Sequence, residues 1–121
     1  MYLTDCYKKL EGDYNGCIGR LIRPDLVSKF LIMFLKDTQY NEFHSAVSSG
    51  NWEAAFRNIH TLKGTSLNLG LTKLADAASV ITELLRSGSP AKDITEETEI
   101  LDAEYSRTIK IIKAYSENPE I

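Results

Sequence analysis

The chain has 121 residues, of which 43% are hydrophobic and 26% charged, a composition typical of one globular domain. Fourteen Lys and Arg against seventeen Asp and Glu give a net charge of −3, and this acidic balance argues against a nucleic-acid-binding module. A closed zinc site takes four ligands and would need both histidines and both cysteines of the chain, so no metal is expected. No segment approaches the roughly 20 apolar residues of a membrane span, and two cysteines without a secretory signal indicate a cytoplasmic protein.

The first part of the chain, about residues 2–22, predicts two short helices. The first carries apolar side chains at helical spacing and ends near Gly12. The second follows from Tyr14 to Ile22, with Cys17 and Ile22 turned inward.

The rest of the domain, about residues 24–115, predicts four long amphipathic helices. Pro24 suits the first turn of a helix, Asn51 suits an N-cap, and Gly70 suits a left-handed C-cap. The expected helices run from Pro24 to about Ser49, from Trp52 to about Leu69, from about Thr72 to Arg86, and from Ile94 to Tyr115.

No segment alternates apolar and polar residues as a strand would. Four long helices joined by short turns favour an all-α fold, an up-down-up-down antiparallel four-helix bundle. The short N-terminal helices would cover one end, the tail 116–121 would be frayed, and residues 1–121 would form a single domain.

The expected helix from Trp52 to about Leu69 places one histidine beside its buried face. If Ile59 and Leu62 face the core, then His60, Lys63, Gly64 and Leu67 share the adjoining stripe, with Phe56 one turn before them. An exposed neutral imidazole is a nucleophile. A glycine in the middle of a helix lowers helix stability by roughly 1 kcal/mol relative to alanine. Gly64 beside His60 therefore suggests that space is kept free for a partner, and the apolar side chains of Phe56 and Leu67 would flank that space. A helix-packing role for Gly64 and a core-edge role for Phe56 and Leu67 are the alternatives.

This segment resembles the signature of histidine-containing phosphotransfer (HPt) domains. The resemblance covers roughly residues 10 to 115 and is carried by His60-Thr61-Leu62-Lys63-Gly64 with Ser66, Leu69 and Gly70, and by Gly50-Asn51-Trp52 and Met33-Phe34-Leu35 upstream. It implies a phosphoryl carrier in a two-component His-Asp phosphorelay. In that role His60 would take a phosphoryl group from the aspartate of one receiver domain and pass it to another. Lys63 would support the phosphoryl group, and Gly64 would let the receiver close in.

The resemblance also implies partners. These would be receiver domains of response regulators or hybrid histidine kinases, which bring the Mg²⁺, so the chain would need no cofactor. It would be a carrier without its own ATP site rather than an enzyme, and a cytoplasmic monomer. It would be free-standing, although a domain of a larger kinase fits the same pattern.

One position departs from the family. Many members carry a Gln or Glu on the following helix that hydrogen-bonds the other ring nitrogen of the histidine, and here Thr82 stands at that place, as the candidate ring orienter. Glu83 would point about 100° away from it on an ideal helix. His44 lacks an accompanying Lys and Gly and is interpreted as structural. Two alternatives stay open: a pseudo-HPt bundle adaptor that binds receivers without phosphoryl transfer, and a generic helical scaffold.

Overall fold

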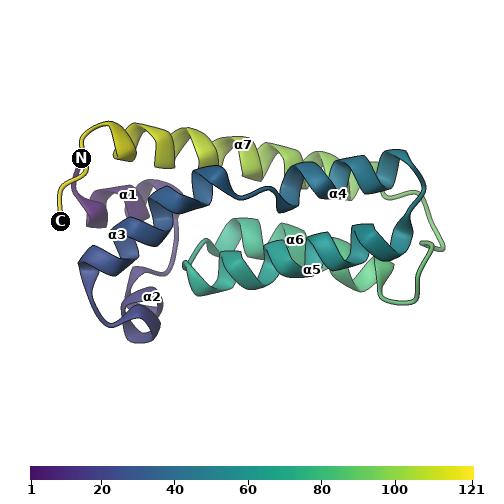
Figure 1. Cartoon of the computed structure of the whole chain (residues 1–121), viewed down its shortest axis with the longest axis horizontal. Helices are drawn as coiled ribbons and strands as arrows, with labels where there is room; N and C mark the ends of the chain where they lie inside the picture. The colour runs from purple at the N-terminus through teal and green to yellow at the C-terminus, as the bar shows by residue number, and fades with distance from the viewer.

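The computed structural model describes residues 1–121 as an all-helical protein, which confirms the predicted all-α class (Figure 1). No helix combines the length and the apolar character that a membrane crossing requires. In Figure 1 the α4–α5 turn and the α6–α7 loop lie at one end of the bundle, and the α5–α6 turn faces the other. The helices are α1 (Leu3–Leu10), α2 (Tyr14–Leu21), α3 (Pro24–Met33), α4 (Gln39–Ser48), α5 (Trp52–Asn68), α6 (Thr72–Leu85) and α7 (Thr95–Glu117), with the 3₁₀ turn η1 (Phe34–Lys36) between α3 and α4.

Side-chain caps and glycines set the ends of α5, as the sequence predicts. The Asn51 side chain accepts a hydrogen bond from the Ala54 amide at 3.2 Å. Gly70 has a φ of +68°, in the left-handed region that favours glycine. A Cβ at Gly70 would collide with the Asp13 carbonyl oxygen, so the α5–α6 turn packs directly on the backbone between α1 and α2.

The predicted single helix from Pro24 to about Ser49 is wrong, because the chain breaks it between α3 and α4. Asp37 leaves the helical conformation, with φ −67° and ψ 137°, and its carboxylate accepts from the Gln39 amide at 2.9 Å. A short acidic side chain that bonds a nearby amide offers the backbone an alternative to the helical ladder. The stretch from Leu26 to Leu35 is almost entirely apolar and so shows no helical phase of its own, which is why the sequence conceals the break.

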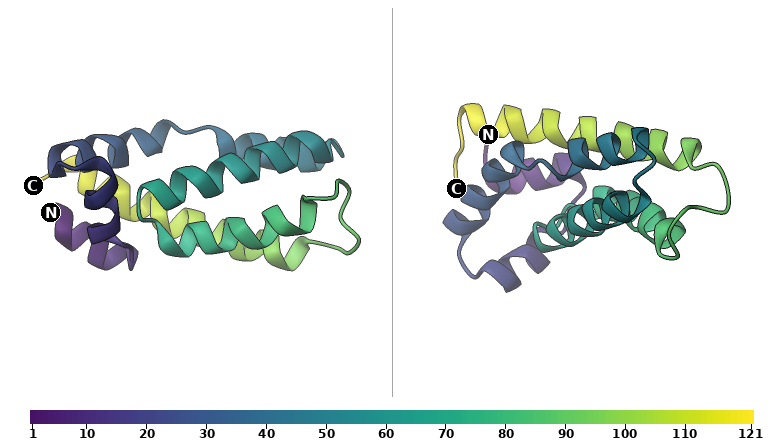
Figure 2. Two further views of the ribbon diagram at one scale, coloured as in Figure 1. Left: turned by 90° about the horizontal axis from the view of Figure 1, so that it is seen from below. Right: turned by 45° about the vertical axis from the view of Figure 1, so that its right-hand side comes forward.

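The core draws on the N-terminal helices as well as the bundle. Leu3, Cys6 and Cys17 are fully or almost fully buried in the same cluster as the side chains of α3 to α7. Figure 2 shows α1, α2 and α3 gathered at the end of the molecule that also holds both termini. Ile22 was predicted to face inward, but its side chain is 78% exposed because α2 ends at Leu21 and the chain turns there with a φ of +72°.

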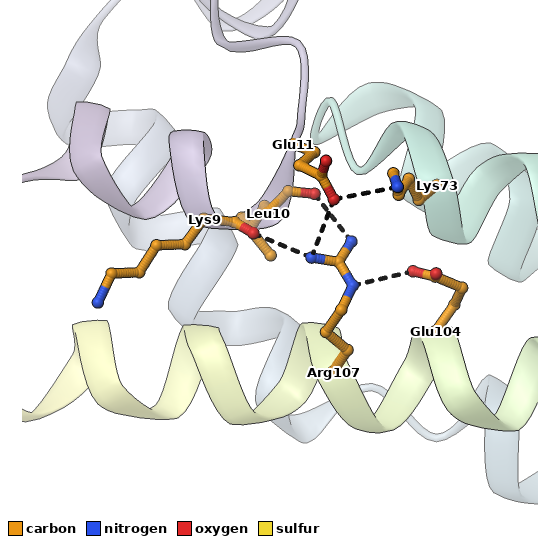
Figure 3. A network of polar contacts seen from close by, with 6 residues as sticks. All are labelled: Lys9, Leu10, Glu11, Lys73, Glu104 and Arg107. Atoms are coloured by element: carbon orange, nitrogen blue, oxygen red, sulfur yellow. Dashed lines mark hydrogen bonds and ion pairs between the residues drawn. The ribbon is translucent and has the colours of Figure 1, made fainter.

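Arg107 of α7 attaches the end of α1 to the bundle (Figure 3). Its guanidinium donates to the Lys9 carbonyl at 2.9 Å and to the Leu10 carbonyl at 3.0 Å, and so satisfies carbonyls that α1 leaves unpaired. Glu104 holds the same guanidinium at 3.1 Å. Glu11 bridges to Lys73 of α6 at 3.0 Å, and this contact lowers the Glu11 pKa.

The predicted frayed tail is also wrong. Helix α7 continues to Glu117, and the following residues pair with the start of the chain. The Leu3 amide donates to the Glu120 carbonyl at 2.7 Å, and the Glu120 amide donates to the Met1 carbonyl at 3.0 Å. Contacts between the two ends of the chain cannot be seen in local sequence patterns. The sequence therefore predicts a frayed tail, although hydrogen bonds to the N-terminus hold it in place.

Candidate functional site

His60 projects from the middle of α5 into solvent. The inward face of α5 is anchored by Ile59, Leu62 and Ser66, whose side chains are all fully buried. His60 itself is exposed, and the structure shows no hydrogen bond to its ring. The prediction that His60 lies beside the core face, on its solvent side, is therefore confirmed.

The helix that carries His60 is held at both ends. Asn51 caps its start, and Arg20 of α2 donates to the Leu67 carbonyl at 2.6 Å and to the Asn68 carbonyl at 3.2 Å at its end. A cation at a helix C-terminus satisfies free carbonyls and favours the helix dipole. The short helix α2 thus fixes the end of the site helix at Leu67 and Asn68.

Gly64 leaves open space beside His60. A Cβ built on Gly64 would have no other atom within 4 Å, apart from its own helix backbone and chain neighbours. Gly64 therefore does not serve helix packing, and this alternative is excluded. The neighbouring Leu67 side chain is 50% exposed, and Phe56 is half-buried against the core. The stripe from Phe56 to Leu67 forms an accessible surface, with apolar side chains before and after the histidine.

Helix α6 adds an ion pair to this surface that the sequence interpretation overlooked. Arg86 donates to the Glu83 carboxylate at 3.1 Å and 2.8 Å, and its guanidinium carbon lies 5.6 Å from the centre of the Phe56 ring. The Phe56 ring centre is also 5.7 Å from that of His60. The Arg86 hydrogen bond is the main cause of a lowered Glu83 pKa, and the charge of Lys63 lowers it further.

Thr82 does not take the position of a ring orienter. Its side chain is fully buried, and its hydroxyl donates to the Ala78 carbonyl at 2.8 Å within α6. Because Thr82 faces the core, the next residue is the one that turns toward the surface around His60. The signal that could have located Glu83 and Arg86 is their acid–base spacing of three residues on the exposed face of the helix after His60.

The second histidine is fixed by neighbouring side chains. His44 Nε2 lies 2.6 Å from Oδ1 of Asp102 on α7, and the Tyr40 hydroxyl donates to the same oxygen at 2.5 Å. The Tyr40 ring stacks on Tyr105, with ring centres 3.7 Å apart. Burial and the Asp102 hydrogen bond raise the Tyr40 pKa. His44 thus links α4 to α7.

The fold and the site together define a helical module that presents one unbonded histidine on an accessible helix face. Comparison with known families gives the class directly: the family model described as the Hpt domain matches residues 29–109. The chain belongs to the Hpt domain family. Hpt domains are phosphocarrier modules that interact with receiver domains in phosphorelays. No curated protein and no solved structure matches the chain.

Proposed function

We propose that this protein carries a phosphoryl group on His60 between the aspartates of receiver domains in a His-Asp phosphorelay. The observation that supports this most is the pairing of an exposed, unbonded His60 with open space at Gly64, in a chain of the Hpt family. A nucleophile that meets its substrate on another protein needs such a surface rather than a closed pocket.

The proposed transfer needs one nucleophile from this chain. A ring nitrogen of His60 attacks the phosphorus of a receiver phosphoaspartate, so a P–N bond forms as the P–O bond to the aspartate breaks. The aspartate carboxylate leaves, and the proton on the other ring nitrogen passes to solvent. Lys63, which makes no ion pair in the structure, offsets the charge of the phosphoryl group. The reverse sequence delivers the group to a second receiver.

The receiver supplies the remaining chemistry in this proposal. Its Mg²⁺ and aspartate form the other half of the reaction centre, so this chain acts without a cofactor or ATP site of its own. Gly64, Phe56 and Leu67 form the surface on which the receiver docks. The protein works as a cytoplasmic monomer, with receivers of response regulators or hybrid kinases as its partners.

Phosphoryl transfer from a receiver tests this proposal. The protein is incubated with a receiver carrying a radiolabelled phosphoryl group, and the label on this chain is tested for acid lability and base stability. We expect labelling of the wild type and of His44→Gln, and none of His60→Gln. Label that persists in His60→Gln would remove His60 from the mechanism.

An adaptor that binds receivers without accepting phosphate is the second candidate. It is favoured by one observation, namely that Thr82 is buried and leaves the His60 ring without a hydrogen-bonded orienter. Receiver binding that is unchanged in His60→Gln, with no label on the wild type, would support the adaptor over the carrier.

A further inference from the structure

We propose that Arg86 is a second phosphoryl-binding cation that Glu83 holds while His60 is free and releases when His60 is phosphorylated. This inference rests on the proposed function of His60. It assigns opposite roles to the two members of one ion pair: Arg86 favours the phosphorylated state, and Glu83 opposes it.

The geometry places the pair next to the site but on a different helix. Phe56 of α5 is close to both groups, with the Arg86 guanidinium carbon 5.6 Å and the His60 ring centre 5.7 Å from the centre of its ring. Arg86 and Glu83 are both more than half exposed, at 52% and 59% of their side chains. Arg86 can therefore leave its present position by side-chain rotation alone, and its guanidinium can move along the Phe56 ring toward the histidine.

Electrostatics supply the force for this exchange. A phosphoryl group brings roughly −1.5 to −2 charges to a site where Glu83 already holds a carboxylate. The charge of Lys63, one turn from His60 on α5, lowers the Glu83 pKa, so the Glu83 carboxylate belongs to the same surface and would be repelled by a phosphoryl group on the ring. The planar guanidinium of Arg86 binds phosphoryl oxygens in the same forked geometry in which it now binds the Glu83 carboxylate.

The test uses phosphoramidate, a small phosphoryl donor, so that no receiver interface is involved. The P–N bond of the reagent breaks, ammonia leaves, and a new P–N bond forms on His60. The ratio of phosphorylated to free protein at equilibrium is measured by intact mass for the wild type, Glu83→Gln, Arg86→Gln and the double variant. The matched control is the pair Arg23–Asp25, which has nearly the same geometry (3.0 Å and 2.7 Å) and exposure (63% and 55%) at the start of α3. Arg23→Gln and Asp25→Asn are measured in parallel.

We expect opposite shifts from the two single variants. Glu83→Gln should raise the equilibrium ratio about two- to fivefold and Arg86→Gln should lower it by a similar factor, which is the range of one exposed charge interaction. The double variant should lie between them, and the Arg23 and Asp25 variants should match the wild type. Shifts in the same direction, no shift, or equal shifts in the controls would overturn the inference. Failure of wild-type His60 to accept phosphate from both phosphoramidate and a receiver would instead overturn the proposed function, and this inference with it.

Discussion

The two histidines of this protein lie on different helices, and their surroundings differ in kind. Both contact an aromatic ring, since the His44 ring lies 4.8 Å from Tyr40 and the His60 ring 5.7 Å from Phe56. His44 is also bonded to Asp102, whereas the His60 ring has no hydrogen bond and stands beside open space at Gly64. Reactivity in the proposed mechanism therefore depends on free ring nitrogens and an open approach, which the residue type alone does not provide.

The structural use of His44 follows from the break in the bundle. The chain breaks at Asp37, so α4 is a separate helix and needs its own attachment to α7. Tyr40 and His44 provide it through one carboxylate oxygen of Asp102. Helices α5 and α6 are already joined by their buried side chains, so their solvent-facing sides need no such attachment. The outer side of α5 is thus free to carry a reactive group.

The largest expected effect comes from closing the approach to His60. Gly64→Gln should slow phosphoryl transfer from a receiver about tenfold or more, because overpacking an interface costs about 1–3 kcal/mol. Gly64→Ala should slow it less while raising the free energy of unfolding by up to about 1 kcal/mol, since alanine is the better helix former and meets open space. Stopped-flow transfer and urea unfolding measure the two quantities. Unchanged transfer rates in Gly64→Gln would show that the receiver does not approach over this position.

Removing the charge of Lys63 next to His60 should have the second-largest effect on the rate of phosphoryl transfer. Lys63→Gln should slow transfer about tenfold, because one close cation contributes about 1 kcal/mol or more to a phosphoryl group in partly screened surroundings. Lys63→Arg keeps the charge and should retain most of the rate. The same stopped-flow assay serves here, and equal rates in Lys63→Gln and Lys63→Arg would argue against an electrostatic role.

Changes at Asp102, the partner of His44, should alter the stability of the protein rather than the rate of phosphoryl transfer. Asp102→Ala removes the acceptor of both His44 and Tyr40 and should lower the free energy of unfolding by about 1–2 kcal/mol. Asp102→Asn keeps an acceptor oxygen and should cost less. His44, once released, should still take no label, because it lacks the neighbouring lysine and glycine. Label at His44 in Asp102→Ala, found by peptide mass analysis, would show that a histidine of this protein can accept phosphate without a neighbouring lysine and glycine.

The smallest effect is expected at Thr82. Thr82→Val replaces a buried hydroxyl that bonds only the Ala78 carbonyl, so the free energy of unfolding should change by less than about 1 kcal/mol. Phosphoryl transfer should stay at the wild-type rate, because the side chain does not face His60. A clear fall in the transfer rate, with an unchanged free energy of unfolding, would show that Thr82 contributes to the function of His60.

Local patterns predicted the helices and the exposed face of α5 well. The spacing of Ile59 and Leu62 placed His60 on the outer side of its helix, and Asn51 and Gly70 marked the ends of that helix. These features depend on interactions within a few residues, which a periodic sequence displays. The break at Asp37 is also local, but it rests on one hydrogen bond from the Gln39 amide, and the almost entirely apolar stretch from Leu26 to Leu35 shows no phase that could reveal it.

The amino-acid sequence by itself determined an all-helical fold and one histidine with a lysine and a glycine beside it. The tertiary structure decided everything that needs two distant segments. It paired His44 with Asp102, 58 positions away, and it tied the tail to the N-terminus. It also decided how α6 is rotated against α5, and so placed Glu83 rather than Thr82 on the surface around His60. The physical reason is that helix periodicity fixes which side chains share a face, whereas the packing of whole helices fixes which faces meet.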